Sequence, residues 1–415
     1  MPPGAARPAR RRTAGRVFLV VFLSVAIGAH LYLAHRLALA PAWPAGVRTA
    51  LLAALGVGFV ALLTQAFVRR RVGRAVGALA WTAYTWLGLA FLLLVASFAS
   101  DLALALLGAA APAGMADGEG IARARALGVG VVGVSVSALA MRRGLSAPEL
   151  RRVEVALARW PRALDGFRIV QLSDVHLGPL LDRRFAASLA ARVNALAPDL
   201  VVVTGDLVDG GVRRIGAEVE PLGALRARHG VFFVTGNHDY YSGADDWVAR
   251  MKGLGWRALR NERVAIEIGG AAFDLAGVDD HHGALVEPGG GEDLARALDG
   301  RDPERPVVLL AHDPATFRRA ARRDVDLQLS GHTHGGQIWP FRWAVRLTVP
   351  WVEGLHRVGR SALYVSRGTG FWGPPMRLGA PAEITELVLR ADPAKIPGGS
   401  DPPGRAVPPG RAPDA

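Results

Sequence analysis

Long apolar runs fill most of the first 145 residues, and they predict helices that cross a membrane. Three runs, Val17 to His35, Thr49 to Val68 and Ala75 to Ser97, each approach the roughly 20 residues that a bilayer-spanning helix needs. The third run stays apolar past Asp101 to Leu107, so the pattern leaves its end open.

A fourth apolar run, Ala126 to Met141, is shorter. It spans a bilayer if the segment from Ile121 to Arg125 places its charged groups at the interface. We therefore expect a basic segment at 1–16, followed by a bundle of about four transmembrane helices over 17–143.

The arginines are distributed unevenly between the two ends of these runs. Eleven lie on one side: Arg7, Arg10, Arg11, Arg12, Arg16, Arg69, Arg70, Arg71, Arg74, Arg142 and Arg143. Four lie on the other: Arg36, Arg48, Arg123 and Arg125. Because basic residues concentrate in cytoplasmic loops, both chain ends are predicted to lie in the cytoplasm. The expected location is the bacterial inner membrane.

The net charge of +13 is concentrated in this N-terminal part. Residues 1–150 carry 15 basic against 4 acidic side chains, whereas residues 151–390 carry 31 against 29. The basic charge therefore indicates membrane topology and contact with anionic lipid, and no nucleic-acid partner is expected. The chain has no cysteine, which excludes disulfides and thiolate chemistry.

Beyond residue 150 the pattern changes to short apolar runs that alternate with amphipathic stretches. The expected strands are 167–172, 200–204, 231–235, 307–311, 327–330, 362–366 and 384–389, with a hairpin at 264–268 and 272–276. The expected helices are 182–196, 217–228, 245–253, 292–299 and 314–323. This alternation predicts an α/β domain over 150–390. The tail at 391–415 is rich in Pro and Gly and is predicted to be disordered.

A polar cluster follows each of five predicted strands. The clusters are Asp174-Val-His176, Gly205-Asp206-Leu-Val-Asp209, Gly236-Asn237-His238-Asp239, His312-Asp313 and Gly331-His332-Thr-His334-Gly335. Clusters at the same end of adjacent strands converge, and Asp-x-His puts both side chains on one side of an extended segment. So many carboxylates and imidazoles together need cations, and N/O ligands without sulfur suit Mn, Fe or Zn.

This ordered set of motifs resembles the calcineurin-like metallophosphoesterase family, over roughly residues 165–390. The run from Gly331 to Gln337, the late Ser366-Arg-Gly368 and the leading spans are similar to its bacterial transmembrane branch, which includes hydrolases of UDP-2,3-diacylglucosamine. The resemblance implies an αββα sandwich. It also implies two divalent metal ions about 3.5–4 Å apart that share a hydroxide for attack at phosphorus.

The resemblance further implies a role for each motif residue. One ion would be held by Asp174, His176, Asp206 and His334, and the other by Asp206, Asn237, His312 and His332. His238 would protonate the leaving group, and Asp239 would fix its tautomer. Asp209 is expected to orient a ligand histidine.

Several residues keep two interpretations. Arg367 and Arg377 could bind a substrate phosphate or form structural ion pairs. His281 and His282 could reach the site or lie on the surface. The aromatic side chains Trp339, Phe341, Trp343, Trp351, Phe371 and Trp372 could fill the core or form an apolar lip facing the membrane.

The function predicted from these residues is metal-dependent hydrolysis of a phosphoester or pyrophosphate by a membrane-anchored enzyme. Its short link to the last span favours a lipid-linked substrate such as UDP-2,3-diacylglucosamine, which would place it in lipid A biosynthesis. The alternatives are a tethered phosphodiesterase of soluble nucleotides and a non-catalytic membrane scaffold. The sequence leaves the oligomeric state open.

Overall fold

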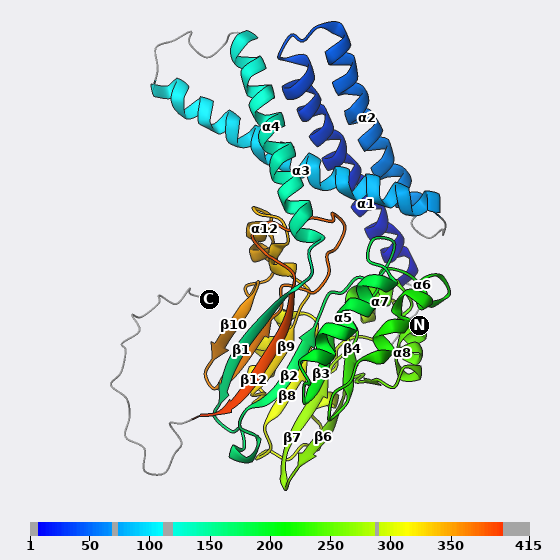
Figure 1. Cartoon of the computed structure of the whole chain (residues 1–415), viewed down its shortest axis with the longest axis vertical. Coiled ribbons are helices and arrows are strands. Elements are labelled where there is room, and N and C mark those ends of the chain that lie inside the picture. Colours follow the sequence, from blue (N-terminus) through cyan, green and yellow to red (C-terminus); the bar gives the residue numbers. More distant parts are fainter. Residues whose placement is uncertain (1–6, 69–73, 111–118, 287–289, 393–415) are drawn as a thin grey trace.

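The computed structural model describes residues 7–68, 74–110, 119–286 and 290–392. A group of long helices stands above a domain of strands and shorter helices (Figure 1). The predicted tail from residue 393 onward, residues 1–6 of the basic segment and Arg69, Arg70 and Arg71 lie outside the described residues.

Four helices make up the N-terminal part: α1 (Arg7–Ala34), α2 (Ala45–Val68), α3 (Arg74–Ala110) and α4 (Glu119–Gly144), with a π-helical turn η1 (His35–Leu39) after α1. By length and composition each of the four could cross a membrane. Helix α3 crosses α1 and α4, and the start of α1 and the end of α4 extend past it toward the strand domain (Figure 1).

Helix α3 continues unbroken past Asp101, which resolves the end that the sequence left open. Asp101 pairs with Arg36 at 2.8 Å and with Arg125, and it accepts a hydrogen bond from the Tyr32 hydroxyl at 2.6 Å. Because these partners satisfy the carboxylate inside the bundle, its charge does not force the helix to end.

Two six-stranded sheets form the second part. The first has the order β1 (Glu149–Leu157), β12 (Glu383–Ala391), β2 (Phe167–Leu172), β3 (Leu200–Thr204), β4 (Val231–Val234), β5 (Arg257–Ala258). The second has the order β10 (Gly354–Val358), β11 (Ser361–Val365), β9 (Leu327–Ser330), β8 (Val307–Leu310), β7 (Ala271–Gly277), β6 (Glu262–Ile268). Strands β2 to β5 are parallel, as are β7, β8, β9 and β11. Parallel neighbours bring their carboxyl ends to one edge.

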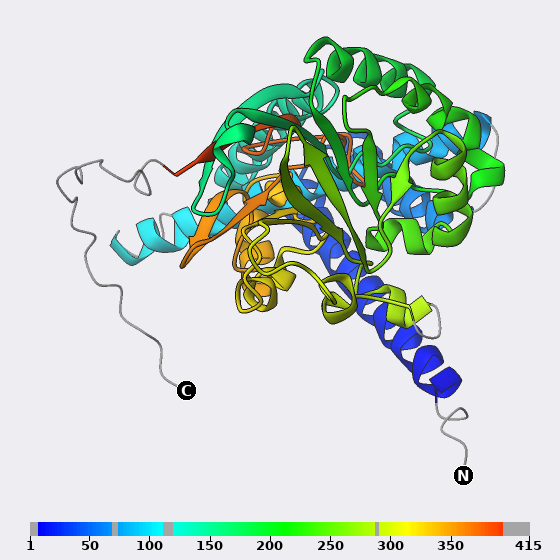
Figure 2. The same cartoon turned by 90° about the horizontal axis from the view of Figure 1, so that it is seen from below.

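Helices cover the outer faces of both sheets (Figure 2). The helices of this part are α5 (Arg183–Ala195), α6 (Val212–Val219), α7 (Asn237–Tyr241), α8 (Ala244–Gly253), α9 (Gly283–Val286), α10 (Leu294–Ala297), α11 (Phe317–Ala321) and α12 (Arg342–Thr348), with 3-10 turns η2 (Arg162–Leu164), η3 (Glu220–Ala224), η4 (Pro314–Thr316) and η5 (His334–Gly336). Helix α12 lies at the end of the sandwich that faces the long helices (Figure 1). One buried core lies between the sheets, around residues such as Ile169, Val202 and Leu329. Two others lie under the helices on either side. The predicted αββα sandwich is confirmed.

The helix predicted at 217–228 is wrong. Helix α6 starts earlier, at Val212, and gives way at Glu220 to the 3-10 turn η3. Pro221 accounts for the change, because it has no N–H to continue an α-helical hydrogen-bond ladder.

The long helices contact the sandwich through a small apolar cluster of Leu92 on α3, Ala140 on α4, Ile338 and Met376. The backbone N–H of Arg377 also donates to the carbonyl of Ala140, at 2.9 Å. The bundle and the sandwich are therefore packed against each other.

Candidate metal centre

The polar clusters that follow the strands meet where the carboxyl ends of both sheets come together. Strands β2, β3 and β4 of the first sheet lead to Asp174, His176, Asp206 and Asn237, and strands β8 and β9 of the second lead to His312, His332 and His334. Burial of nearly all of these side chains means that their charges need partners within the site.

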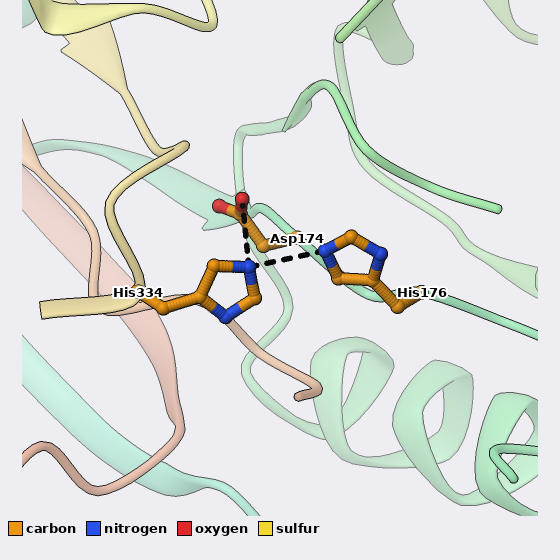
Figure 3. A group of neighbouring side chains, drawn as sticks. All are labelled: Asp174, His176 and His334. Atoms are coloured by element: carbon orange, nitrogen blue, oxygen red, sulfur yellow. Dashed lines mark hydrogen bonds and ion pairs between the residues drawn. The ribbon is translucent and has the colours of Figure 1, made fainter. Parts of the chain in front are cut away.

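One group of donors consists of Asp174, His176 and His334 (Figure 3). The Nε2 atoms of His176 and His334 lie 3.0 Å apart, and His334 Nε2 lies 3.4 Å from Asp174 Oδ1. Asp206 Oδ2 lies 3.9 Å from His176 Nε2. Two ring nitrogens and carboxylate oxygens that point at one spot fit a divalent cation.

A second group lies beside the first and shares Asp206 with it. Asp206 Oδ2 is 3.2 Å from His312 Nε2, and His332 Nδ1 is 3.0 Å from Asn237 Oδ1 and 3.3 Å from His312 Nε2. The seven predicted ligands therefore form two adjoining sets, with Asp206 Oδ2 between them. This donor arrangement fits two cations.

The backbone at the ligands is held in an uncommon conformation. Asp174, His176, Asp206, His332 and His334 all have positive φ angles, between 51° and 71°. Side-chain-bearing residues rarely adopt this region, and such strain concentrates at functional sites.

Two glycines let the ligand segments approach closely. A Cβ on Gly331 would lie 1.9 Å from Ser173 Oγ, and one on Gly236 would lie 2.2 Å from Asp206 Oδ1. Both distances are impossible for a real side chain, so these positions require glycine.

The electrostatics of two ligands, Asp206 and His334, favour the protonation states that bind metal. Burial would raise the pKa of Asp206, but His312, His238 and His176 hold it well below its usual value, so the carboxylate is ionised. Burial, together with the neighbouring His176 and Arg377, lowers the pKa of His334 well below its usual value, so its imidazole is neutral.

His238 lies beside the first group of donors, and its partner differs from the one predicted. Its Nδ1 is 2.6 Å from Asp209 Oδ1. Burial lowers the pKa of His238, but Asp206 and Asp209 raise it to about 9. Asp209 also lies 3.2 Å from His176 Nδ1, so it contacts a ligand histidine, as the sequence suggested, as well as His238.

Asp239 does not contact His238 in the way expected. Its carboxylate accepts backbone N–H groups of Asp206 and Gly236 at Oδ2 and of Leu207 at Oδ1, at 2.8 to 3.0 Å. Because α7 starts at Asn237, the Asp239 side chain turns back to the helix start and the adjoining ligand loop. Its predicted role as the orienting carboxylate is therefore wrong, and it is a structural acceptor.

The two candidate substrate-binding arginines have structural partners. Arg377 is 0% exposed and donates to the carbonyls of Gly370, Arg367 and Ala380. Its burial favours a structural role over contact with a substrate. Arg367 pairs with the buried Glu383 at 2.6 Å, which fits the structural interpretation.

An apolar cavity of about 320 Å³ adjoins the candidate metal ligands. It is lined by His332, Thr333, His334, Gly336, Gln337, Ile338, Phe341, Val345, Thr348, Val349, Trp372, Pro374 and, from α3, Leu87, Gly88 and Phe91. Sequence reasoning missed the contribution of α3, because no local motif in an apolar helix indicates which face meets a distant site.

The aromatic residues divide between the two predicted environments. Trp339, Phe341, Trp343 and Trp372 are about half exposed. Phe371 is buried in a core cluster, and Trp351 packs on Phe317 with ring centroids 5.3 Å apart. Phe341 and Trp372 also line the cavity, so these two form an apolar lip there, whereas Phe371 fills the interior and Trp351 is partly buried.

A sandwich of two sheets with two adjoining N/O ligand sets at its strand ends defines a class of protein built to hold a pair of cations. Comparisons with known proteins identify its family. Residues 167–336 match the family described as calcineurin-like phosphoesterase.

Two relatives illustrate the similarity. A transmembrane protein with metallophosphoesterase domain from Bos taurus is 44% identical over 257 residues, covering 59% of this chain and 58% of the relative. An uncharacterized metallophosphoesterase from Aquifex aeolicus is 35% identical over 226 residues, covering 54% of this chain and 85% of the relative. Among solved structures, a dimetal phosphatase from Danio rerio has a TM-score of 0.34 at 14% identity, covering 55% of this chain and all of that one.

The chain belongs to the calcineurin-like phosphoesterase family. The chain spans only 58% of the length of the bovine relative. These matches confirm the resemblance at the level of the family.

Proposed function

We propose that this chain is a membrane-associated, metal-dependent phosphoesterase whose substrate carries a hydrocarbon chain. The observation that carries the proposal is the apolar cavity, which touches both the ligand histidines His332 and His334 and the candidate span α3. A substrate with its phosphorus at the metal centre would have room there for an apolar group.

The cavity offers little to a polar ligand, because its polar side chains are already engaged. The Thr333 hydroxyl donates to the carbonyl of Val352, and the Thr348 hydroxyl to that of Val345. The Gln337 amide is bonded to the backbone of Trp372 and Pro374. No Asp, Glu, Lys or Arg of the described residues lines it. A soluble nucleotide would leave its ribose and base unpaired there, which is unfavourable.

The chemistry we assign rests on the clustered ligands and on His238. Divalent cations bound by the seven ligands would polarise the phosphoryl group. Asp209 holds His238 through Nδ1, which leaves Nε2 to deliver a proton to the departing oxygen. Trp372 lies with its ring centroid 5.7 Å from that of His238, so the proposed acid adjoins the wall of the cavity.

A non-catalytic scaffold explains these features less well. Five ligands are held at positive φ, and such strain has a cost of order 1–3 kcal/mol per residue. UDP-2,3-diacylglucosamine is one member of the proposed substrate class, and the structure favours the class as a whole. The predicted membrane is the bacterial inner membrane, with the sandwich on its cytoplasmic side.

Hydrolysis itself is tested with purified full-length protein, loaded with Mn²⁺ or Zn²⁺ in detergent, on an aryl phosphodiester. We expect turnover in the wild type and near-background activity in Asp206→Ala, with about one fewer ion bound per chain. The exposed Asp245→Ala is the control, and it should behave as wild type. Normal turnover in Asp206→Ala, with both ions retained, would contradict the assignment.

The hydrocarbon chain is tested with two diesters that share a leaving group, methyl and hexadecyl p-nitrophenyl phosphate. Val345 lines the cavity from α12, so Val345→Trp should fill it and lower kcat/KM for the hexadecyl ester by at least about tenfold. The methyl ester should be hydrolysed as by wild type, because it does not reach into the cavity.

The matched control is Leu347→Trp, on the same helix at a position that is 88% exposed and does not line the cavity. It should leave both esters unaffected. An equal loss on both esters in Val345→Trp, or none on either, would refute the role of the cavity.

A further inference from the structure

A second cluster of aspartate and histidine lies one strand further along the same edge of the second sheet. The parallel strands β9 and β8 lead to the ligands His332, His334 and His312, and the next strand, β7, leads to Asp280, His281 and His282. Carboxyl ends of adjacent parallel strands lie side by side, so this cluster adjoins the centre already described. The rings of His282 and His332 are 6.4 Å apart.

The donors of this cluster are close enough to share one ion. Asp280, His281 and His282 each offer a ligand atom, and these atoms all lie within 4.8 Å of one another. Asp313 adds a further oxygen, with Oδ2 at 3.4 Å from His281 Nδ1.

The buried carboxylate of Asp280 is only half satisfied. Its Oδ1 accepts the backbone N–H of His282 and lies 2.8 Å from the His282 Nδ1. Its Oδ2 is buried and has no hydrogen-bond partner among the described residues, and Asp280 is 2% exposed. An unpaired buried oxygen of this kind costs about 1–3 kcal/mol or more, and a cation would remove that cost.

The positions of the two imidazoles also favour a bound cation. The rings of His281 and His282 have centroids 4.1 Å apart, although the residues are neighbours in sequence, because the chain turns there into α9. Two adjacent imidazoles facing two carboxylates, with no sulfur, match the ligands of Mn²⁺, Fe²⁺ and Zn²⁺.

We infer that Asp280, His281, His282 and Asp313 form a third divalent-cation site at the rim of the two-cation centre. The site is built from residues that belong to neither set of candidate ligands. Its occupancy does not depend on whether the protein hydrolyses a phosphoester, so the two proposals can fail separately.

The test counts Mn²⁺ ions by equilibrium dialysis of the full-length protein in detergent, at free Mn²⁺ up to the millimolar range. Electron paramagnetic resonance distinguishes the coupled pair expected at the shared Asp206 from an isolated ion. We expect three ions per wild-type chain, one of them isolated. His281→Ala/His282→Ala should bind two and lose only the isolated signal.

The control His356→Ala changes a histidine of β10, outside all these clusters, and should retain three ions. Because the double variant could disturb folding, the single His281→Ala, at a side chain that is 46% exposed, gives a second measurement. It should weaken binding of the isolated ion by at least about tenfold. Two ions in the wild type, or an isolated ion that persists unchanged in these variants, would overturn the inference.

Activity is measured on the same samples. If the wild type binds three ions, the variants lose the third and no sample hydrolyses the ester, the proposed function is refuted and the third site stands. If the wild type hydrolyses the ester but binds only two ions, the third site is refuted and the proposed function stands.

Discussion

At the scale of single residues, Asp209 connects the candidate acid to the candidate metal ligands. Its Oδ1 lies 2.6 Å from His238 Nδ1 and 3.2 Å from His176 Nδ1. A carboxylate that fixes the orientation of an imidazole affects a proton transfer without touching the substrate. Asp209 is therefore a positioning residue.

Asp209→Asn should lower turnover strongly for esters with poor leaving groups, approaching the roughly 10²–10⁴-fold loss expected for His238→Gln. Activated aryl esters should lose less, because their leaving group needs little protonation. The double variant Asp209→Asn/His238→Gln should be no slower than His238→Gln alone, since both changes remove the same proton transfer. Kinetics on the two ester classes, with metal content measured in parallel, check this.

Asp239→Asn is the matched comparison. It places an amide where a carboxylate accepts three backbone N–H groups, so stability should fall by about 1–3 kcal/mol in denaturant unfolding. If Asp239→Asn reproduced the leaving-group dependence and Asp209→Asn did not, the two roles would be reversed.

The seven metal-binding candidates were predicted from the resemblance of the motifs to a known family. Their partners were not. Asp209 and Asp239 lie on either side of His238 in the chain order of motifs, and only the turn of α7 decides which of them meets it. The burial of Arg377 likewise depends on carbonyls that a loop brings together.

At the scale of elements, the buried strands were the most predictable. Strands β2, β3 and β9 have the predicted bounds, because short, largely buried strands rich in Val, Ile and Leu contrast with the polar turns around them. The edge strand β10, which is largely exposed, was missed for the opposite reason. The contact of α3 with the sandwich also could not be predicted, since every face of that helix is apolar.

Gly88 lies where α3 packs against the loop that contains Pro374 and Met376. A Cβ there would lie 2.5 Å from Met376 Sδ and 3.1 Å from Pro374 Cβ, so Gly88→Val should push α3 away from the loop. Overpacking of this kind costs about 1–3 kcal/mol, and we expect a lower midpoint of thermal unfolding in detergent.

Gly128 on α4 is the control, because a Cβ there meets nothing within 4 Å. Gly128→Val makes the same change in a helix and should leave the midpoint close to that of wild type. Equal midpoints for the two variants would mean that α3 does not pack tightly against the sandwich at Gly88.

At the scale of the whole molecule, the starts of α1 and α3 and the end of α4 all lie toward the sandwich (Figure 1). The α1–α2 connection lies at the far end of the bundle. The end of α4 carries Arg142 and Arg143, two of the arginines that the positive-inside rule assigns to the cytoplasm.

A fluorescent-protein fusion after Arg390 should therefore fluoresce in a bacterial host, and an alkaline phosphatase fusion at the same point should be inactive. Fusions in the connection near Pro41 should give the reverse pattern. An active phosphatase after Arg390 would place the sandwich outside the cytoplasm.

The position of the cavity between α3 and His332 has a kinetic consequence. A substrate that enters from the bilayer is supplied in two dimensions, so its surface mole fraction, rather than its bulk concentration, determines the rate. Diluting hexadecyl p-nitrophenyl phosphate with neutral detergent, at a constant amount in the tube, should slow its hydrolysis in proportion. The methyl ester, dissolved in water, should be hydrolysed at a constant rate throughout the same dilution series.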